Sequence, residues 1–260
     1  WQDQKSKSYR SFDKEKMTGL MKKLDGQKAV VEEIKKTPKK TYAPLLYDLT
    51  ELQREANQRF GYSAKETLNI MQRLYENHKV LTYPRTDSRY LSKDIVPTIK
   101  DRLEACGTGP YRKLAMTAKK KDLSGKLAFV NDAKVSDHHA IIPTEQFVDL
   151  SHMTNEERKI YDLVVRRFLA VLYPPFEYEQ TQVTVKVGDE TFLASGKIVK
   201  AQGWRAAYEE EVYLAEDEEE EEAYESGKSL KGQTLPELEK GQEIKGLVLS
   251  LTEGKTKPPA

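Results

Sequence analysis

The hydrophobic pattern of this chain changes its period at Pro174-Pro175. Between residues 44 and 173, apolar side chains recur at the spacing of one face of an α-helix. After Pro175 they alternate with polar residues, as in a half-buried strand, at Val183, Val185 and Val187. A strand-like stretch, AVVEEI at 29–34, precedes the helical block. This order predicts an α+β fold, in which a helical domain is inserted into a β-rich domain.

Capping signals predict where the helices begin and end. In a capping box, a Ser or Thr and a Glu or Gln three residues later satisfy free amides of the first helical turn. Three such pairs occur here: Thr50 with Gln53, Ser63 with Glu66, and Thr154 with Glu157. Gly61 is expected to end the first of these helices. Other helices are expected over 17–24 and over 93–105, the latter with Pro97 in its first turn.

Turn residues divide the β-rich parts. Lysines and Pro38 are typical of a linker between the first strand and Pro44. On the other side of the helical block, Gly188-Asp189 predicts a turn, and strands are expected over 190–199, 204–208 and 241–254. The acidic run EEEVYLAEDEEEEEAYE at 209–225 is most simply a solvated loop.

The distribution of charge favours a polyanionic partner. The formal net charge is only +1, but residues 209–225 hold eleven acidic side chains and no basic one. The rest of the chain therefore carries a net charge of about +12. A basic surface of this kind can approach nucleic acid, although an ordinary solvated surface is also rich in lysine.

Several classes of protein fit the sequence poorly. No run of about 18 apolar residues occurs, and the first ten residues, WQDQKSKSYR, lack an apolar signal region, so we expect neither a membrane partner nor secretion. With Cys106 as the only cysteine, a disulfide within the chain and a zinc site of several thiolates are excluded. A cytoplasmic location is expected. The start at Trp1 and the tail GKTKPPA suggest a piece of a longer protein.

The stretch LTYPRTDSRYLS at 81–92 contains the first candidate site. Pro84 disfavours helix for the residue before it, so the chain is extended there and the side chains of Tyr83 and Arg85 share a face. A phenol with a pKa of about 10 becomes a useful nucleophile when a cation stabilises its charge, and arginine binds phosphate oxygens. The pair suits attack on a phosphodiester. The alternative is structural, with Tyr83 packed on a helix and Arg85 paired with Asp87.

The second candidate site is SDHHAIIPT at 136–144. Adjacent histidines in an extended chain face opposite ways, which argues against one metal bound by both His138 and His139. Either imidazole can instead donate a proton or a hydrogen bond to a phosphate oxygen. A buried or surface histidine without a function is the alternative.

Together these residues resemble a known family. LYENHKVLTYPRTDSRYLS at 74–92 and DHHAIIPT at 137–144 resemble active-site segments of type IA DNA topoisomerases, particularly the bacterial topoisomerase III branch. Further similar segments are YDLTELQREANQRFGYSAKETLNIMQRLYE at 47–76, GKIVKAQGWRAAY at 196–208 and TKPPA at 256–260. The resemblance covers nearly the whole chain in the order of the family.

The resemblance implies a mechanism and a set of site residues. Tyr83 would attack a phosphate of single-stranded DNA and become linked to its 5′ end, Arg85 would bind the phosphate, and His138 would hydrogen-bond near it. The bond energy is kept in the phosphotyrosine, so resealing needs no nucleotide. The other positions expected to contact DNA are Gln72, Thr82, Ser88, Arg89 and His139.

The resemblance also implies an architecture. The family forms a torus, and this chain resembles its movable arch, with residues 44–173 as the helical domain and residues 1–43 and 174–260 as halves of a β-rich hinge domain. The magnesium-binding domain of the family, with its Asp-x-Asp-x-Glu cluster, has no match here, because the chain contains no Asp-x-Asp. The other domains of a parent chain are therefore expected partners, and this piece alone is expected to be inert.

Three other classes of protein share some of these features. Tyrosine recombinases need a His-x-x-Arg before the tyrosine, and replication relaxases need His-hydrophobe-His, so both fit worse than the resemblance above. The third is a non-catalytic module that binds single-stranded DNA through a basic surface and stacked aromatic rings. The aromatic candidates for that module are Tyr42, Tyr47, Tyr62, Tyr90 and Trp204.

Overall fold

The computed structural model describes residues 1–208, 232–233 and 235–254, and the acidic run at 209–225 lies outside them. The chain divides into two compact units. A helical unit contains residues 40–176 and the segment that begins at Ala201. A β-rich unit contains residues 1–39, 177–200 and the described residues beyond 231. Each unit is a separate compact body, and the fold combines helices with a sheet in which β1 and β5 pair antiparallel and β3 and β4 pair parallel.

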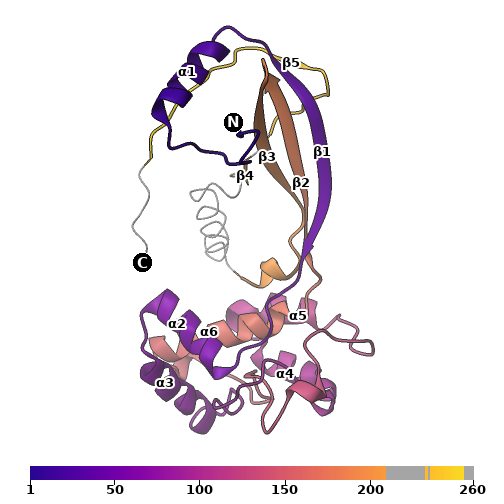
Figure 1. Cartoon of the computed structure of the whole chain (residues 1–260). Coiled ribbons are helices and arrows are strands. Elements are labelled where there is room, and N and C mark those ends of the chain that lie inside the picture. Colours follow the sequence, from indigo (N-terminus) through magenta and orange to yellow (C-terminus); the bar gives the residue numbers. More distant parts are fainter. Residues whose placement is uncertain (209–231, 234, 255–260) are drawn as a thin grey trace. The chain divides into compact units, whose positions relative to one another are not determined.

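The helical unit is built around α6, Asn155–Ala170, whose Ile160, Val164 and Phe168 are fully buried. Helices α2, α3 and α5 pack against α6 (Figure 1). Burial of a large apolar side chain contributes about 1.5–3 kcal/mol, so this contact forms the core of the unit. The other helical elements are α2 Leu49–Phe60, α3 Ala64–Glu76, η1 Lys93–Thr98, α4 Ile99–Cys106, η2 Gly109–Tyr111, α5 Arg112–Ala118, η3 Asp132–Lys134, η4 Leu150–His152 and η5 Gly203–Ala207.

Two of the three predicted capping boxes are confirmed. Ser63 with Glu66 caps α3, and Thr154 with Glu157 caps α6, each with both reciprocal hydrogen bonds. The third, at Thr50 and Gln53, is wrong because α2 begins earlier, and the carboxylate of Asp48 accepts from the amide of Glu51 at 2.7 Å. An aspartate caps a helix as well as a threonine does, so both sites were available to the chain.

The helix predicted over 93–105 is present, but its first part is a 3-10 helix. Residues 93–98 are a 3-10 helix, and only Ile99–Cys106 are α-helical. Pro97 explains the difference, because it has no amide to donate and its ring obstructs the α-helical hydrogen bond of the preceding turn. Gly61 takes a left-handed φ of 71° at the end of α2, as predicted.

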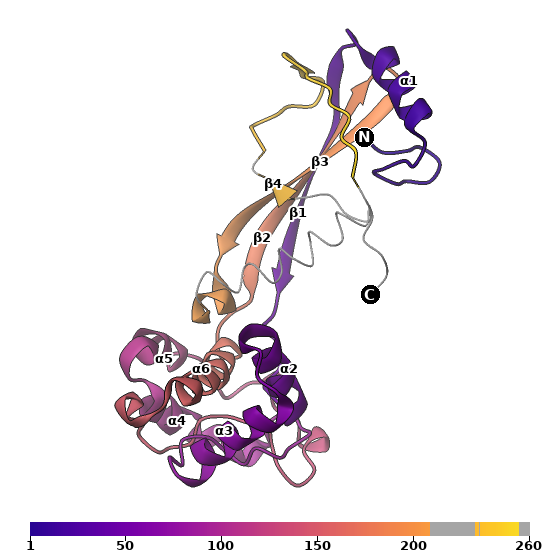
Figure 2. The same ribbon diagram turned by 90° about the vertical axis from the view of Figure 1, so that its left-hand side faces the viewer.

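The β-rich unit contains one five-stranded sheet in the order β4-β3-β2-β1-β5. Figure 2 shows the three long strands side by side. Helix α1, Lys14–Leu24, buries Leu24 against Ala29 and Val187 of the sheet. Ala29 pairs with Ile244 in the antiparallel β1-β5 pair. The strands are β1 Ala29–Thr41, β2 Phe176–Val187, β3 Glu190–Ala201, β4 Gly232–Gln233 and β5 Glu243–Ile244.

Three expectations about the β-rich parts are wrong. The linker expected around Pro38 is part of strand β1, which pairs with β5 only at Ala29 and Val30 in the described residues, well before Pro38. The strand expected over 204–208 is mostly the 3-10 helix η5, since Gly203 turns at φ 49° and the amide of Trp204 bonds to Pro174 O at 2.9 Å. Within 241–254, only Glu243–Ile244 form a strand. The turn at Gly188 is confirmed, with φ 56°.

No helix in the described part of the chain combines the length and apolar composition that crossing a membrane requires.

Candidate active site

The two candidate segments lie against each other in the helical unit. Leu81 forms an antiparallel bridge with Pro143, and the amide of Thr82 donates to Ile142 O at 3.0 Å. These are backbone contacts between stretches that are far apart in the sequence. The structure therefore brings the Tyr83 segment and the His138 segment into one site.

Two threonines hold the segments in register. The Thr82 hydroxyl accepts from the amide of Ile142 at 3.0 Å and lies 3.4 Å from Ala140 O. The Thr86 hydroxyl donates to His138 O at 2.9 Å. Each hydroxyl thus serves as a hydrogen-bond partner that the neighbouring backbone would otherwise lack. Thr82, predicted to contact DNA, lines the cavity beside Tyr83 but uses its hydroxyl to join the two segments.

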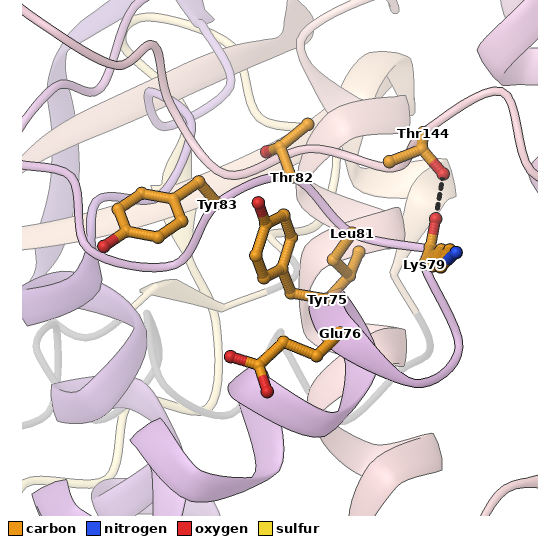
Figure 3. Close-up of a pocket in the computed structure, with 7 residues that line it drawn as sticks. All are labelled: Tyr75, Glu76, Lys79, Leu81, Thr82, Tyr83 and Thr144. Carbon is orange, nitrogen blue, oxygen red and sulfur yellow. Dashed lines mark hydrogen bonds between the residues drawn. The ribbon is translucent and has the colours of Figure 1, made fainter.

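Tyr83 lies between two other rings. The imidazole of His138 is 4.5 Å away between centroids at an interplanar angle of 41°, and Tyr75 of α3 contacts Tyr83 edge-on at 5.5 Å. The phenol oxygen of Tyr83 makes no hydrogen bond with any residue that the structure describes. In Figure 3 this oxygen points away from Tyr75. The ring is therefore held by contacts on its sides, while its reactive atom is free.

Arg85 is exposed and uncommitted. Its guanidinium forms no hydrogen bond or ion pair within residues 1–208 or the later described stretches. Of the structural alternative, the packing of Tyr83 on a helix is confirmed through Tyr75 of α3, but the pairing of Arg85 with Asp87 is wrong. Asp87 instead accepts a long hydrogen bond from Ser136 at 3.5 Å. A free arginine two residues from Tyr83 is available to bind an anion.

The adjacent histidines have different surroundings. His138 is exposed, whereas His139 is half-buried and its Nδ1 lies 2.7 Å from Ala140 O. Burial lowers the pKa of His139 below its ordinary value, although the bond to Ala140 opposes the shift. His138 is thus the histidine that meets Tyr83 and solvent together.

The remaining predicted residues differ in accessibility. Gln72 is half-buried on α3. Ser88 is buried, and its hydroxyl donates to Lys134 O at 2.7 Å, so it braces the loop before the histidines. Arg89 is half-buried and donates to Leu46 O at 3.2 Å. The assignment of all three to DNA contact remains a prediction.

Two buried arginines that the sequence did not indicate contact the backbone next to the site. Arg102 is 6% exposed, donates to Pro143 O at 2.8 Å and pairs with Glu145 at 2.8 Å. Arg167 of α6 binds Glu55 at 2.7 Å and lies over the ring of Tyr47 at 4.2 Å. The carbonyl of Tyr47 in turn accepts from Ile141 at 2.8 Å. The one sequence signal for the burial of Arg167 is its position in a predicted helix between the apolar pairs Val164-Val165 and Phe168-Leu169.

A cavity of about 580 Å³ lies beside Tyr83. Four of its residues, Tyr75, Glu76, Lys79 and Thr144, are not among the site residues predicted from the sequence. Tyr75 has the helical spacing of the apolar residues Leu68 and Met71 on α3, but it is 37% exposed. The other lining residues are Leu81, Thr82 and Tyr83.

The described residues do not fit a magnesium site. Within them, no group of three or more His, Cys, Asp or Glu side chains is arranged to hold a metal ion. Glu76 is the single carboxylate that lines the cavity beside Tyr83. Magnesium prefers several oxygen ligands, so we derive no metal step from this part of the chain.

Comparisons with known proteins assign the whole chain to a family. The family model described as DNA topoisomerase matches residues 1–260. DNA topoisomerase 3 of Bacillus subtilis (strain 168) is 54% identical over 260 residues, which are 100% of this chain and 34% of that protein. DNA topoisomerase 3 of Bacillus anthracis is 56% identical over the same 260 residues and 34% of its length. The chain thus spans about a third of the relatives it matches.

A solved structure shares the fold. Full-length topoisomerase I from Thermotoga maritima matches with a TM-score of 0.62 over 93% of this chain and 36% of that chain. The sequence identity is 23%, so this likeness concerns the fold alone.

Proposed function

Since the chain belongs to the type IA DNA topoisomerase family, we propose that it forms the tyrosine-bearing part of a DNA topoisomerase. The enzyme cleaves one DNA strand, passes another strand through the gap and reseals the break. The observation that supports this most directly is the free phenol oxygen of Tyr83, held between Tyr75 and His138 beside an uncommitted Arg85.

The chemistry follows from these groups. The Tyr83 oxygen attacks the phosphorus of a phosphodiester, forms a phosphotyrosine with the 5′ end, and releases the 3′ hydroxyl of the other piece. Resealing is the reverse attack by that hydroxyl, which restores the phenol, so no nucleotide is consumed. Arg85 neutralises the phosphate oxygens, whose negative charge increases during attack. His138 donates a hydrogen bond to the same phosphate or a proton to the leaving oxygen.

The substrate is single-stranded DNA. A phosphodiester must reach the oxygen of a tyrosine whose ring contacts two other rings and lines a cavity, and an extended single strand can do so without unpairing. The basic balance of the chain outside residues 209–225 favours the approach of DNA. A cytoplasmic location is part of this proposal.

The two units suit a hinged arch. The helical unit takes up residues 40–176, between chain segments that belong to the β-rich unit. In the proposal, the helical unit carries the covalently held DNA end, and the strands that connect it to the β-rich unit act as a hinge. Magnesium belongs to another domain of a longer parent chain, which supplies hard-cation chemistry near the phosphate. The 260-residue chain alone is therefore inert in cleavage.

A trapping experiment tests the proposal. Labelled single-stranded DNA is mixed with magnesium and with the chain, alone or joined to the metal-binding domain of a homologue, and the reaction is stopped with detergent. A covalent adduct is expected only with the joined protein. Tyr83→Phe should abolish the adduct and leave DNA binding intact, whereas Tyr42→Phe, which removes a hydroxyl from an exposed ring outside the site, should change neither.

The outcome also decides between catalysis and binding alone. An adduct that persists in Tyr83→Phe would overturn the assignment of the nucleophile. DNA binding without any adduct in the joined protein would favour the non-catalytic binding module. The aromatic residues support that module poorly. Tyr47 and Trp204 are buried, and among its five candidates only Tyr42 is exposed, at 73%.

A further inference from the structure

Lys79 has an unusual backbone conformation. Its φ is +57°, and among the described residues only Lys7 is another non-glycine residue with positive φ. Side chains disfavour this left-handed region because Cβ crowds the next carbonyl oxygen. Helix α2 ends at such a position with Gly61, whereas the chain after α3 turns at a lysine. Non-glycine residues in this region often occur at functional sites.

The surrounding hydrogen bonds fix this conformation. The amide of Val80 donates back to Leu74 O at 3.0 Å, which closes the end of α3. The hydroxyl of Thr144, at the end of the His138 segment, donates to Lys79 O at 2.6 Å (Figure 3). The turn at Lys79 therefore connects α3, the Tyr83 segment and the His138 segment. Glycine would make the same backbone contacts without the steric cost.

The lysine side chain makes no contact that explains its presence. Lys79 is exposed, and its ammonium has no ion pair or hydrogen bond in the part of the chain that the structure describes. It lines the cavity that also contains Tyr75 and Tyr83. In the view of Figure 3, Tyr75 lies between Tyr83 and Lys79.

We propose that this cavity is a subsite for a nucleotide next to the cleaved phosphate, in which Lys79 contacts a backbone phosphate and Tyr75 stacks on the base. The inference rests on the proposed function and extends it to two residues. A volume of about 580 Å³ lies within the range of small-molecule pockets. Tyr75 contacts Tyr83 by an edge-to-face arrangement at 79° and remains 37% exposed, which leaves ring surface for a base.

Glu76 adds a negative charge to the cavity lining that Lys79 can offset. It is exposed and is the acidic residue of the cavity lining. A carboxylate beside the path of DNA repels phosphate, and a cation on the same lining offsets that repulsion. The subsite therefore predicts opposite effects of neutralisation, with tighter DNA binding in Glu76→Gln and weaker binding in Lys79→Gln.

The salt dependence of DNA binding tests the phosphate contact. The chain is titrated with fluorescent oligothymidylate over a range of KCl concentrations. For single strands, each phosphate contact adds about 0.7 to the slope of log K against log salt, so Lys79→Gln and Lys79→Gly should each lower it by about 0.7. Lys79→Arg should keep the slope. Lys65→Gln is the control, because Lys65 is exposed, also unpaired among the described residues, and lies ~16 Å along α3 from Glu76, the last residue of that helix.

Stability separates binding from folding. Lys79→Gly removes the charge and also the steric cost of a side chain at positive φ. Its thermal midpoint should therefore equal or exceed that of the wild type, while its affinity for DNA falls. Tyr75→Ala should weaken binding about five- to a hundredfold without changing the salt slope, because it removes stacking and not a charge. Tyr75→Phe should bind as the wild type does.

Each contrary result has a definite meaning. An unchanged slope in both Lys79→Gln and Lys79→Gly, or no binding by the wild-type chain at low salt, would overturn the subsite. Loss of binding only in variants with a lowered thermal midpoint would also overturn it. The proposed function is tested separately by the Tyr83-dependent adduct, which would still form in the joined wild-type protein if the subsite did not exist.

Discussion

The ring of His138 lies 4.5 Å from the ring of Tyr83, although the two residues come from separate segments of the chain. The Thr86 hydroxyl holds the backbone of His138 in place at 2.9 Å. The imidazole is exposed on one side and in contact with the phenol on the other. This contact is the geometric basis of the proposed cleavage site.

Replacing this imidazole should slow DNA cleavage. General acid catalysis or a hydrogen bond to a phosphate is worth about 10²–10⁴-fold in rate, so His138→Ala should reduce adduct formation by that order in the joined protein. DNA binding should change little. His152→Ala provides the control, since His152 is an exposed histidine on η4 beside Asp149. Equal cleavage rates for His138→Ala and the wild type would remove His138 from the mechanism.

The Thr82 hydroxyl should matter for stability. Thr82→Val keeps the shape of the side chain but leaves the amide of Ile142 without its acceptor at 3.0 Å. An unsatisfied group of this kind costs about 1–3 kcal/mol in the free energy of unfolding. Urea unfolding followed by fluorescence of the buried Trp204 measures the effect. Thr82→Ser retains the hydroxyl and should lose less than Thr82→Val, and the reverse order would contradict the role of the hydroxyl.

Replacing Arg167 without also replacing its partner Glu55 should destabilise the fold. Its guanidinium binds Glu55 at 2.7 Å, the hydroxyl of Tyr208 at 2.9 Å and Leu45 O at 3.1 Å. Arg167→Met leaves the partly buried Glu55 carboxylate with only Arg59 and the Tyr47 hydroxyl as partners, and should cost about 1–3 kcal/mol in the free energy of unfolding. Additional replacement of Glu55 by Gln should restore part of the loss. Urea unfolding of both single variants and the double variant gives the coupling, and simple additivity would refute it.

Glu157 should make stability depend on pH. Burial alone would raise its pKa, but hydrogen bonds from Arg73 at 2.7 Å and from the Thr154 amide at 2.9 Å, with the charge of His78, hold the pKa below the ordinary 4.5. A carboxyl whose folded pKa is depressed contributes stability above its unfolded pKa and loses it as pH falls through the folded pKa. This contribution should therefore be complete above about pH 5 and decline in more acidic solution.

Unfolding free energies measured between pH 3 and pH 7 in Glu157→Gln and the wild type test this dependence. The difference between the two proteins should shrink as pH falls. Asp101→Asn controls for the change in net charge, because Asp101 is exposed on α4 and has no hydrogen bond or ion pair among the described residues. A difference that stays constant with pH would show that the Glu157 charge does not stabilise the fold.

Local interactions explain the parts of the fold that the sequence predicted. The boxes at Ser63 and Thr154 depend only on hydrogen bonds within one helical turn, so their residues alone specify them. The alternating valines of β2 and the turn at Gly188 are also local patterns. Where two local solutions compete, as Asp48 and Thr50 do at the start of α2, the pattern indicates a helix but not its first residue.

The candidate site divides in the same way. The sequence by itself predicted Tyr83, Arg85 and His138 as site residues, because all three belong to two short motifs, and their catalytic roles stay a prediction. Only the tertiary structure decided that His138 meets Tyr83, that Thr82 joins the segments, and that Lys79 turns with positive φ beside the same cavity. These features depend on contacts between distant residues and on burial. No periodicity in the sequence predicts these features, because the contacts that stabilise them form only when the chain folds.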